Sequence, residues 1–441
     1  DLQEKRESSV FIRRDPYERF VSLLVYVPRD LYDTAARLRV EDVLRHYYGA
    51  ESVDFDVLLS DSALARLHFV ARVPRDAVLP DVDAETVTDR IVGALRSWEE
   101  DIAEFTAPAG DAITAEDMAR RDRWMHAFPL SYQEDHTPRQ AVDDIERFEA
   151  LESDDRPFVR MYRPEGEDEA DVRLAFYRIA PAGLSAILPF LANLGAVVHD
   201  ERPYELDLPD GEHRYVYDFG LSFSRPLADG DFARIESAFA SAWTGERETG
   251  RMDSLVAAGL EWQDVSIIRA FTHYLRQAGF SLTERHMGEV FTTHGEITAA
   301  LVELFRVRFD PDLDEKQGSR ADRAAEVEER IEKALAEVAS LDADRVLRSV
   351  LALIRATVRT NVYQPADGRM PAAAVFKIHP TELDFVPKPR PALEMWVYSP
   401  EVEGVHLRFG PVARGGLRWS DRADDFRTEV LGLVKAQMVK N

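Results

Sequence analysis

The strongest constraint on the fold is an order of hydrophobic periodicities that occurs twice along the chain. In its first occurrence, a near-continuous apolar run from Phe20 to Val27 ends at Pro28, which indicates a buried strand. Apolar residues then recur at helical spacing, alternate with polar residues in two successive runs, and return to helical spacing. These later segments span residues 40–48, 53–57, 67–73 and 87–105. The first stretch therefore has the order strand, helix, strand, strand, helix.

The same order returns further along the chain. Gly195 ends its first helical segment, and Pro209-Asp210-Gly211 is a turn signal between its two alternating runs. Its segments span residues 172–176, 184–194, 204–208, 215–223 and 232–243. A β-α-β-β-α order is the core of a ferredoxin-like or ACT-like module, in which two helices cover one face of an antiparallel sheet. The sequence predicts an α+β multidomain protein with two such βαββα(β) modules.

The rest of the chain divides into three parts. Residues 107–155 are polar and contain proline, whereas residues 253–362 carry apolar stripes at helical spacing and no strand of any length. Strand patterns resume at 375–378, 394–398 and 405–409. The predicted division is a module at 1–108, a linker at 109–154, a second module at 155–248, a helical segment at 249–360 and the start of a further domain at 361–441.

Charge and composition restrict the classes of function. Aspartate and glutamate total 81 against 55 lysines and arginines, so the formal net charge of -26 repels a phosphate backbone and nucleic acid is not expected as a partner. The chain has no cysteine, which excludes disulfides, thiolate catalysis and cysteine-based zinc sites. No apolar run approaches the roughly 18–20 residues of a membrane span, and no signal peptide is visible. We expect a cytoplasmic protein without membrane contact.

The common motifs of enzyme chemistry do not occur. The sequence contains no GxGxxG, no Walker A loop, no HExxH and no GxSxG. His286 and His294 are close in sequence but lack the one-turn spacing that would place two ligands on one helical face. No metal site is therefore predicted.

One stretch, from Gly410 to Trp419, stands apart because its two consecutive glycines remove side-chain bulk and permit positive φ. Such a turn lets backbone amides and cations approach a small anion. Helical spacing follows from Phe426 to Gln437, with Lys440 near the end of that helix. The turn and the helix can converge two cations on a dicarboxylate. The alternatives are a plain loop after a strand, or an Arg-Gly-Gly tract of the RNA-binding kind, which a single copy in an acidic chain disfavours.

These residues carry a resemblance to a known family. Arg414-Gly415-Gly416-Leu417-Arg418-Trp419, followed by a helix and then Gln437-Met438-Val439-Lys440, resembles the start of the catalytic domain of the glutamate dehydrogenases. Two motifs are closer still to the large NAD-dependent class. They are Gly-Gly-Leu-Arg-Trp-Ser-Asp-Arg and, upstream of it, Arg359-Thr360-Asn361-Val362-Tyr363-Gln364. Over roughly the last eighty residues the resemblance is one of specific sequence motifs, and over the rest of the chain it is one of domain architecture. It implies that 361–441 is the truncated start of an α/β dehydrogenase substrate domain, with its first strands and helix.

The resemblance also implies roles for single residues. Arg414 matches the family lysine that holds the side-chain carboxylate of glutamate, Lys440 matches the lysine that holds the α-carboxylate, and Gln437 is its polar companion. Gly415 and Gly416 complete the substrate-binding turn. Arginine at 414 departs from the family pattern, because a guanidinium grips a carboxylate bidentately where an ammonium acts as a point charge. The family's catalytic lysine is expected beyond Asn441, so no catalytic residue is predicted in this chain.

The implied reaction is oxidative deamination of L-glutamate by NAD to 2-oxoglutarate and ammonium. NAD would be bound by a part of the parent protein that is not in this chain, and the chain alone is expected to be inactive. The two modules would be regulatory and could take amino-acid effectors, and the family implies a homo-oligomer. The alternative is a non-catalytic ACT-like amino-acid sensor in which the Gly-Gly turn is structural.

Overall fold

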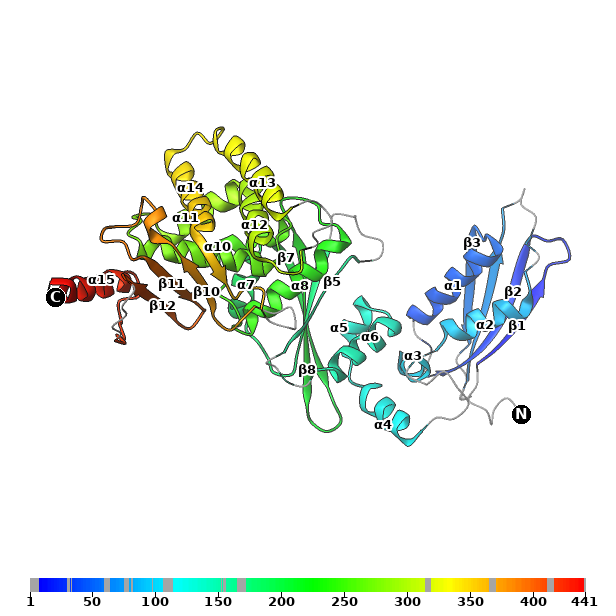
Figure 1. Cartoon of the computed structure of the whole chain (residues 1–441). Helices are drawn as coiled ribbons and strands as arrows, with labels where there is room; N and C mark the ends of the chain where they lie inside the picture. Colours follow the sequence, from blue (N-terminus) through cyan, green and yellow to red (C-terminus); the bar gives the residue numbers. More distant parts are fainter. Residues whose placement is uncertain are drawn as a thin grey trace. The chain divides into compact units, whose positions relative to one another are not determined.

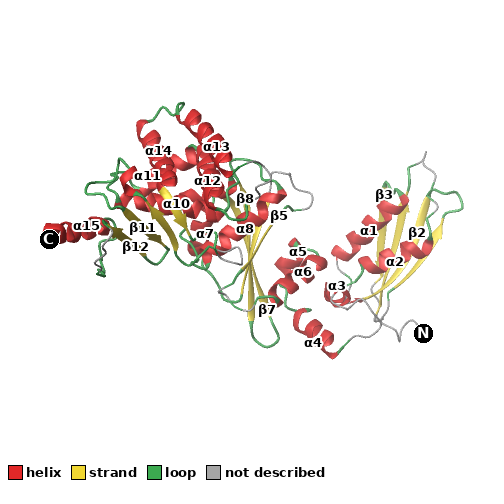
Figure 2. Cartoon of the chain, in the orientation of Figure 1, coloured by secondary structure: helices red, strands yellow, loops and turns green. Residues whose placement is uncertain are grey.

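The computed structural model describes residues 8–29, 32, 34–58, 64–74, 79–80, 82–96, 98–105, 114–151, 153, 156–164, 172–313, 319–364, 370–410 and 416–439. The chain forms two compact units, and each is described by itself (Figures 1 and 2). The first unit comprises Asp1–Glu146 and Leu206–Glu212, and the second comprises Arg147–Glu205 and His213–Asn441.

The first unit contains the first predicted module. Its sheet has the strand order β1-β2-β4-β3, and all three pairings are antiparallel. Every second side chain of β2 is buried, and Figure 1 shows α1 and α2 lying over one side of this sheet. The elements are β1 (Ser9–Arg14), β2 (Phe20–Pro28), α1 (Thr34–Tyr48), β3 (Ser52–Leu58), β4 (Leu64–Arg72) and α2 (Ala84–Ala94). The antiparallel sheet with helices on one face is confirmed, but the edge strand β1 was not predicted.

Two further predictions in this unit need correction. The helix predicted from residue 87 to 105 is two helices, because α2 ends before Leu95 and a new helix begins at Trp98. The stretch predicted as a linker, 109–154, contains α-helices in its described part. Tyr132 donates a hydrogen bond of 2.7 Å to Asp144, which joins two of them. The helices are α3 (Trp98–Phe105), α4 (Ala115–Trp124), α5 (Leu130–Asp135) and α6 (Pro138–Glu149).

The second unit begins with the second module, whose sheet repeats the order of the first as β5-β6-β8-β7. The register repeats as well, because Leu23 lies opposite Phe69 in the first sheet and Leu174 lies opposite Phe219 in the second. All four side chains are fully buried. The elements are β5 (Phe158–Tyr162), β6 (Val172–Arg178), α7 (Leu184–Asn193), β7 (Val197–Asp207), β8 (His213–Ser222) and α8 (Asp229–Trp243). In both modules the additional strand precedes the βαββα core, whereas the sequence left it as an optional last strand.

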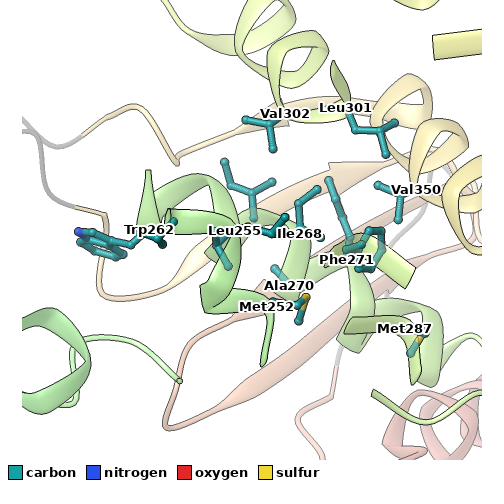
Figure 3. Packing of buried hydrophobic residues seen from close by; sticks show 14 of the residues in the cluster. Met252, Leu255, Trp262, Ile268, Ala270, Phe271, Met287, Leu301, Val302 and Val350 are labelled. Atoms are coloured by element: carbon teal, nitrogen blue, oxygen red, sulfur yellow. The ribbon is translucent and has the colours of Figure 1, made fainter. Parts of the chain in front are cut away.

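The helical segment packs around α10, whose residues are buried along almost its whole length. Figure 3 shows Ile268 and Phe271 of this helix among side chains of the surrounding helices, including Leu301 and Val350. The elements are η2 (Arg251–Asp253), α9 (Ser254–Ala257), α10 (Trp262–Gln277), α11 (Glu284–Thr293), α12 (Gly295–Phe309), α13 (Arg320–Leu335) and α14 (Leu341–Ala356). One apolar core runs from the second module through these helices into the last sheet.

The last sheet has the order β12-β11-β10-β9 with antiparallel pairings. The helical segment was predicted to reach residue 360, but its last four residues form a strand that pairs with β10, which suits the β-branched Thr357, Val358 and Thr360. The elements are β9 (Thr357–Thr360), β10 (Ala374–Ile378), η4 (Pro380–Glu382), β11 (Leu393–Tyr398), β12 (Glu403–Arg408) and α15 (Phe426–Val439). None of the helices in the described ranges is both long enough and apolar enough to cross a membrane.

Candidate functional site

The predicted glycine-rich turn lies between β12 and α15. Gly416 is exposed, and among the described residues no atom lies within 4 Å of the position that a Cβ would take there. Leu417 and Trp419 are exposed as well. The backbone at Gly416 is therefore not crowded by any described atom, which is the property that close approach of a ligand requires.

The residues after the turn are tied to the first turns of α15 by one carboxylate. Arg418 Nε donates to Glu429 Oε1 at 2.8 Å, and Ser420 Oγ donates to Glu429 Oε2 at 2.6 Å. The hydrogen bonds from Ser420 and Arg418 hold the pKa of Glu429 below its usual value, so this carboxylate stays charged at neutral pH. Arg418 is therefore engaged within the protein, and Arg418 and Ser420 are tied to α15, the helix that carries Gln437.

The start of α15 is anchored by an ion pair that is fully buried. Arg427 Nε and Nη2 donate to the two oxygens of Glu394 at 2.7 and 2.8 Å, and neither side chain is exposed. Burial opposes the charge of Arg427, but the Glu394 carboxylate outweighs it and raises the pKa of the guanidinium. Gln277 of α10 adds a second anchor, because its amide accepts from the Arg427 backbone at 3.1 Å and donates to the Ala423 carbonyl at 2.7 Å.

The structure describes some of the predicted site residues and not others. Gly416 is described, and Gln437 lies in α15, although its side chain lies outside the description. Arg414, Gly415 and Lys440 lie outside the described residues. Of the predicted substrate-binding residues, the structure thus describes Gly416 and the backbone of Gln437, and the contacts to α15 come from Arg418 and Ser420.

The anchoring residues were not found from the sequence, although one signal pointed to them. Glu394 is in phase with Trp396 and Tyr398, the buried positions of β11. A carboxylate on the buried face of a strand requires a partner. That partner, Arg427, is 33 residues away in sequence, so the pattern of the strand alone does not identify it.

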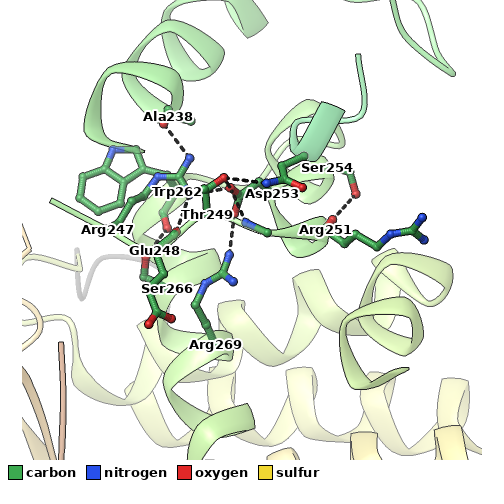
Figure 4. A network of polar contacts seen from close by, with 12 residues as sticks. Ala238, Arg247, Glu248, Thr249, Arg251, Asp253, Ser254, Trp262, Ser266 and Arg269 are labelled. Carbon is green, nitrogen blue, oxygen red and sulfur yellow. Dashed lines mark hydrogen bonds and ion pairs between the residues drawn. The ribbon is translucent and has the colours of Figure 1, made fainter. Parts of the chain in front are cut away.

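A second polar cluster lies between α8 and α10 and is centred on the fully buried Asp253 (Figure 4). Arg247 Nη1 approaches Asp253 Oδ2 at 2.8 Å, Arg269 Nη2 donates to Oδ1 at 2.7 Å, and Thr249 donates to Oδ2 at 2.7 Å. Arg247 also donates to the Ala238 carbonyl of α8 at 2.6 Å. Burial lowers the pKa of Arg247. The cluster joins the second module to the helical segment.

A third cluster surrounds the buried His273 of α10. Its Nδ1 hydrogen-bonds with Glu403 of β12, and its Nε2 lies 3.5 Å from both Glu248 and Glu284. Burial alone would lower the pKa of His273, but Glu284 and Glu403 outweigh it and raise that pKa to about 9. The three carboxylates thus create a strongly negative field around one imidazole.

The second unit also contains a cavity of about 630 Å³ against α8 and the start of α10. Its lining is mixed: Ser237, Ser241 and Gln263 supply polar groups, and Arg156 and Glu246 supply one charge of each sign. The Gln263 side-chain oxygen is buried and has no hydrogen-bond partner among the described residues. A cavity with convergent polar groups of this kind suits a small polar ligand.

Sequence comparisons show which known proteins this chain resembles. Residues 330–441 match the family model described as "Bacterial NAD-glutamate dehydrogenase, catalytic domain". Over its full length the chain is 40% identical to the NAD-specific glutamate dehydrogenase of Halomonas elongata, and 39% identical to those of Pseudomonas aeruginosa and Mycobacterium tuberculosis. The chain is therefore similar to a part of the bacterial NAD-specific glutamate dehydrogenases.

Other glutamate dehydrogenase models match the parts that precede the catalytic region. The ACT2 and ACT3 domains match residues 9–99 and 157–235, and helical motifs 2 and 3 match residues 114–151 and 248–311. The ACT2 match begins at the first residue of β1. The chain spans 27% of the length of the Halomonas and Pseudomonas glutamate dehydrogenases and 28% of the Mycobacterium one.

Proposed function

We propose that the longer protein containing this chain oxidatively deaminates L-glutamate with NAD, giving 2-oxoglutarate and ammonium. The observation that carries the proposal is the match of residues 330–441 to a bacterial NAD-glutamate dehydrogenase catalytic domain, together with identity of 39–40% over the whole chain. The division into two ACT-like modules, a helical segment and the start of a catalytic domain belongs to the same proposal, as do assembly as a homo-oligomer and a cytoplasmic location.

In this proposal Arg414 and Lys440 hold the two carboxylates of glutamate, with Gln437 as the polar companion of Lys440. A dianionic substrate approaching a chain of net charge -26 needs locally fixed cations. Two features support the clamp. Glu429 ties the segment after the turn to α15, and the Arg427–Glu394 pair fixes where α15 begins. Holding both carboxylates would orient the Cα hydrogen of glutamate for transfer to the nicotinamide, which accepts hydride.

The described residues do not fit a dinucleotide site. Their strand pairings are antiparallel, whereas the usual nicotinamide-dinucleotide fold is a parallel sheet with a glycine-rich first turn. We propose that the NAD site, and the lysine that transfers the proton, lie in another part of the longer protein. The segment described above then contributes substrate binding only.

The clamp is tested by steady-state kinetics of the longer protein. Removing one cation from a desolvated carboxylate costs several kcal/mol, so Lys440→Ala should lower kcat/KM for glutamate by orders of magnitude with little loss of fold. Arg414→Lys should be milder than Arg414→Ala. Lys435→Ala is the matched control, because Lys435 lies on α15 and is exposed. Near-normal turnover by Lys440→Ala would refute the clamp.

We also propose that the ACT-like modules regulate the enzyme by binding small amino acids. The cavity against α8 supports this, because it offers polar and charged groups suited to an amino acid. Amino acids other than glutamate should then shift turnover, and Gln263→Leu should reduce that shift while unliganded turnover stays close to normal. A non-catalytic sensor is the competing function. NAD-linked glutamate turnover by the longer protein separates the two, because a sensor would bind amino acids without turnover.

A further inference from the structure

The cluster around His273 holds an unsatisfied nitrogen. Residue His273 is only 9% exposed, and its Nε2 has no hydrogen-bond partner among the described residues. The nearest acceptors are carboxylate oxygens of Glu248 and Glu284, each 3.5 Å away. One ligand atom from each of the three residues lies within 4.8 Å of the other two. A buried imidazole nitrogen thus faces two carboxylates across a gap slightly wider than a good hydrogen bond.

The spacing matches the edges of a metal coordination shell. Zn–N and Zn–O bonds of about 2.0–2.2 Å in a tetrahedral site separate neighbouring ligand atoms by roughly 3.3–3.5 Å. The two distances from His273 Nε2 have this length. Three protein ligands would leave a fourth position for water.

The surroundings of the three residues resemble the outer shell of a metal site. Metal-binding histidines usually donate their other ring N–H to a carboxylate, and Glu403 accepts that bond from Nδ1 here. Tyr398 donates to Glu248 Oε2 at 2.7 Å and so orients it. Arg276 and Arg269 lie 3.5 and 3.8 Å from Glu284, and both are also paired with aspartates.

We propose that His273, Glu248 and Glu284 bind one divalent transition-metal ion of the Zn²⁺ type. An imidazole nitrogen with two carboxylates suits Zn²⁺ better than Mg²⁺ or Ca²⁺, which prefer oxygen ligands alone. The carboxylates of Glu248, Glu284 and Glu403 around the imidazole also attract a metal cation, which would replace a proton on Nε2. Glu248 and Glu284 keep about a third of their side-chain surface exposed, which provides an access route.

The ion would connect elements that are distant in sequence. Glu248 follows α8 of the second module, His273 and Glu284 belong to α10 and α11, and Glu403 begins β12, which leads to the glycine-rich turn. Metal binding would therefore stabilise the junction of the module, the helical segment and the last sheet. The site is independent of the proposed glutamate chemistry.

The sequence did not predict this site, because its ligands are separated by 25 and 11 residues. Ligands on one helix show a helical spacing, whereas these come from a loop and two helices. His286 and His294, the histidines considered from the sequence, take no part in the cluster.

The test is metal binding by the full 441-residue chain, measured by isothermal titration with Zn²⁺, and with Mg²⁺ as a contrast. The expected result is one Zn²⁺ per chain, at least tenfold weaker binding in Glu284→Gln and in His273→Gln, and a rise in the melting temperature of the second unit with Zn²⁺. His286→Ala and Glu289→Gln are matched controls on the same helix α11 and should bind normally. His213→Ala removes an exposed histidine 3.3 Å from Glu205 and detects binding at the surface.

Circular dichroism identifies variants that fail to fold, and Glu284→Gln, whose side chain is about one-third exposed, remains informative if His273→Gln does not fold. Glu403→Gln should weaken binding about tenfold through the orientation of the imidazole, as outer-shell changes usually do. Absence of Zn²⁺ binding, Zn²⁺ binding by Glu284→Gln and His273→Gln as tight as by the unaltered chain, or loss of binding only in His213→Ala would each overturn the proposal.

Discussion

The two ACT-like modules have the same sheet order and central register, but their sheets are buried differently. In β2 of the first module, buried and half-buried side chains alternate, so the helices cover one face of the sheet. In the second module every residue of β6 except the last is buried, and so is the continuous run Val216–Leu221 of β8. The second face of that sheet carries an ion pair, in which Arg173 Nε donates to Asp218 at 3.0 Å, and Tyr162 donates to the same carboxylate.

The cores of the two modules differ in the same way. The buried apolar residues of the first module lie between Val21 and Leu95 and form a cluster of their own in the described chain. Those of the second module belong to the core that continues through the helical segment into the last sheet. The same fold thus has a core of its own in the first module and contributes to a larger shared core in the second.

The largest expected effect follows from this difference. A polypeptide of residues 8–105 should fold alone, because its apolar core is complete, whereas one of residues 156–247 should not, because η2, α9 and α10 complete its core. Circular dichroism with thermal unfolding should show a cooperative transition for the first and none for the second. A cooperative transition in each of the two polypeptides would show that the second module also folds independently, and the contrast between the modules would be lost.

The register equivalence gives a matched pair of substitutions. Phe69→Ala and Phe219→Ala each remove a fully buried ring at the same position of the two sheets, and each should cost about 3–5 kcal/mol. Calorimetry of the full chain should show Phe69→Ala lowering the transition of the first unit alone. Phe219→Ala should lower the transition of the whole second unit, from the module to the last sheet. A shift of both transitions by either substitution would contradict separate cores.

The elements with clear periodicity could be predicted from the sequence, and those with weak patterns could not. The βαββα order of both modules follows from alternating and helical spacing at positions such as Leu23 and Leu174. β1 was missed because its burial pattern is shallow, with no fully buried residue. The break between α2 and α3 was missed because apolar spacing continues through Leu95 and Trp98.

The hydrophobic pattern of the sequence does not identify the partners in the buried polar clusters. Arg427 pairs with Glu394, and Arg247 and Arg269 both pair with Asp253, only because separate segments meet in three dimensions. A sequence shows that a charge occupies an apolar position, as at Glu394, but it does not show which residue neutralises it. The substrate-site predictions at Arg414 and Lys440 rest on family resemblance and stay predictions.

A third substitution tests how the second module is joined to the helices. Asp253→Asn leaves Arg247 and Arg269 buried with less compensation, and should cost about 3 kcal/mol in the unfolding of the second unit. Asp54→Asn in the first module is the control, because Asp54 pairs with Arg72 at the surface, and it should change stability by less than about 0.5 kcal/mol. Chemical denaturation measures both. Similar effects would mean that the Asp253 cluster adds nothing beyond a surface pair.

The smallest expected effect concerns the start of the second helix in each module. Asp83 caps α2 by accepting from the Thr86 backbone at 3.0 Å, whereas α8 begins after Ala228, which has no side-chain acceptor. Asp231 already accepts from the Ala228 N–H at 3.0 Å, so Ala228→Ser would complete a capping box. We expect a gain of about 0.5–1 kcal/mol in the second unit, and a fall of a few degrees in the melting temperature of the first unit for Asp83→Ala.

The two caps should respond differently to pH, which distinguishes a capping effect from a general change in stability. Hydrogen bonds from Thr86 hold the pKa of Asp83 below its ordinary value of 3.8. The stabilisation by Asp83 is therefore present above that value and is lost as pH falls through the lower pKa of the folded state. Calorimetry at neutral pH and near pH 3 should show the Asp83→Ala deficit shrinking, while the serine hydroxyl in Ala228→Ser, which does not titrate, keeps its capping bond. An Asp83→Ala deficit that is independent of pH would mean that the carboxylate does not cap α2.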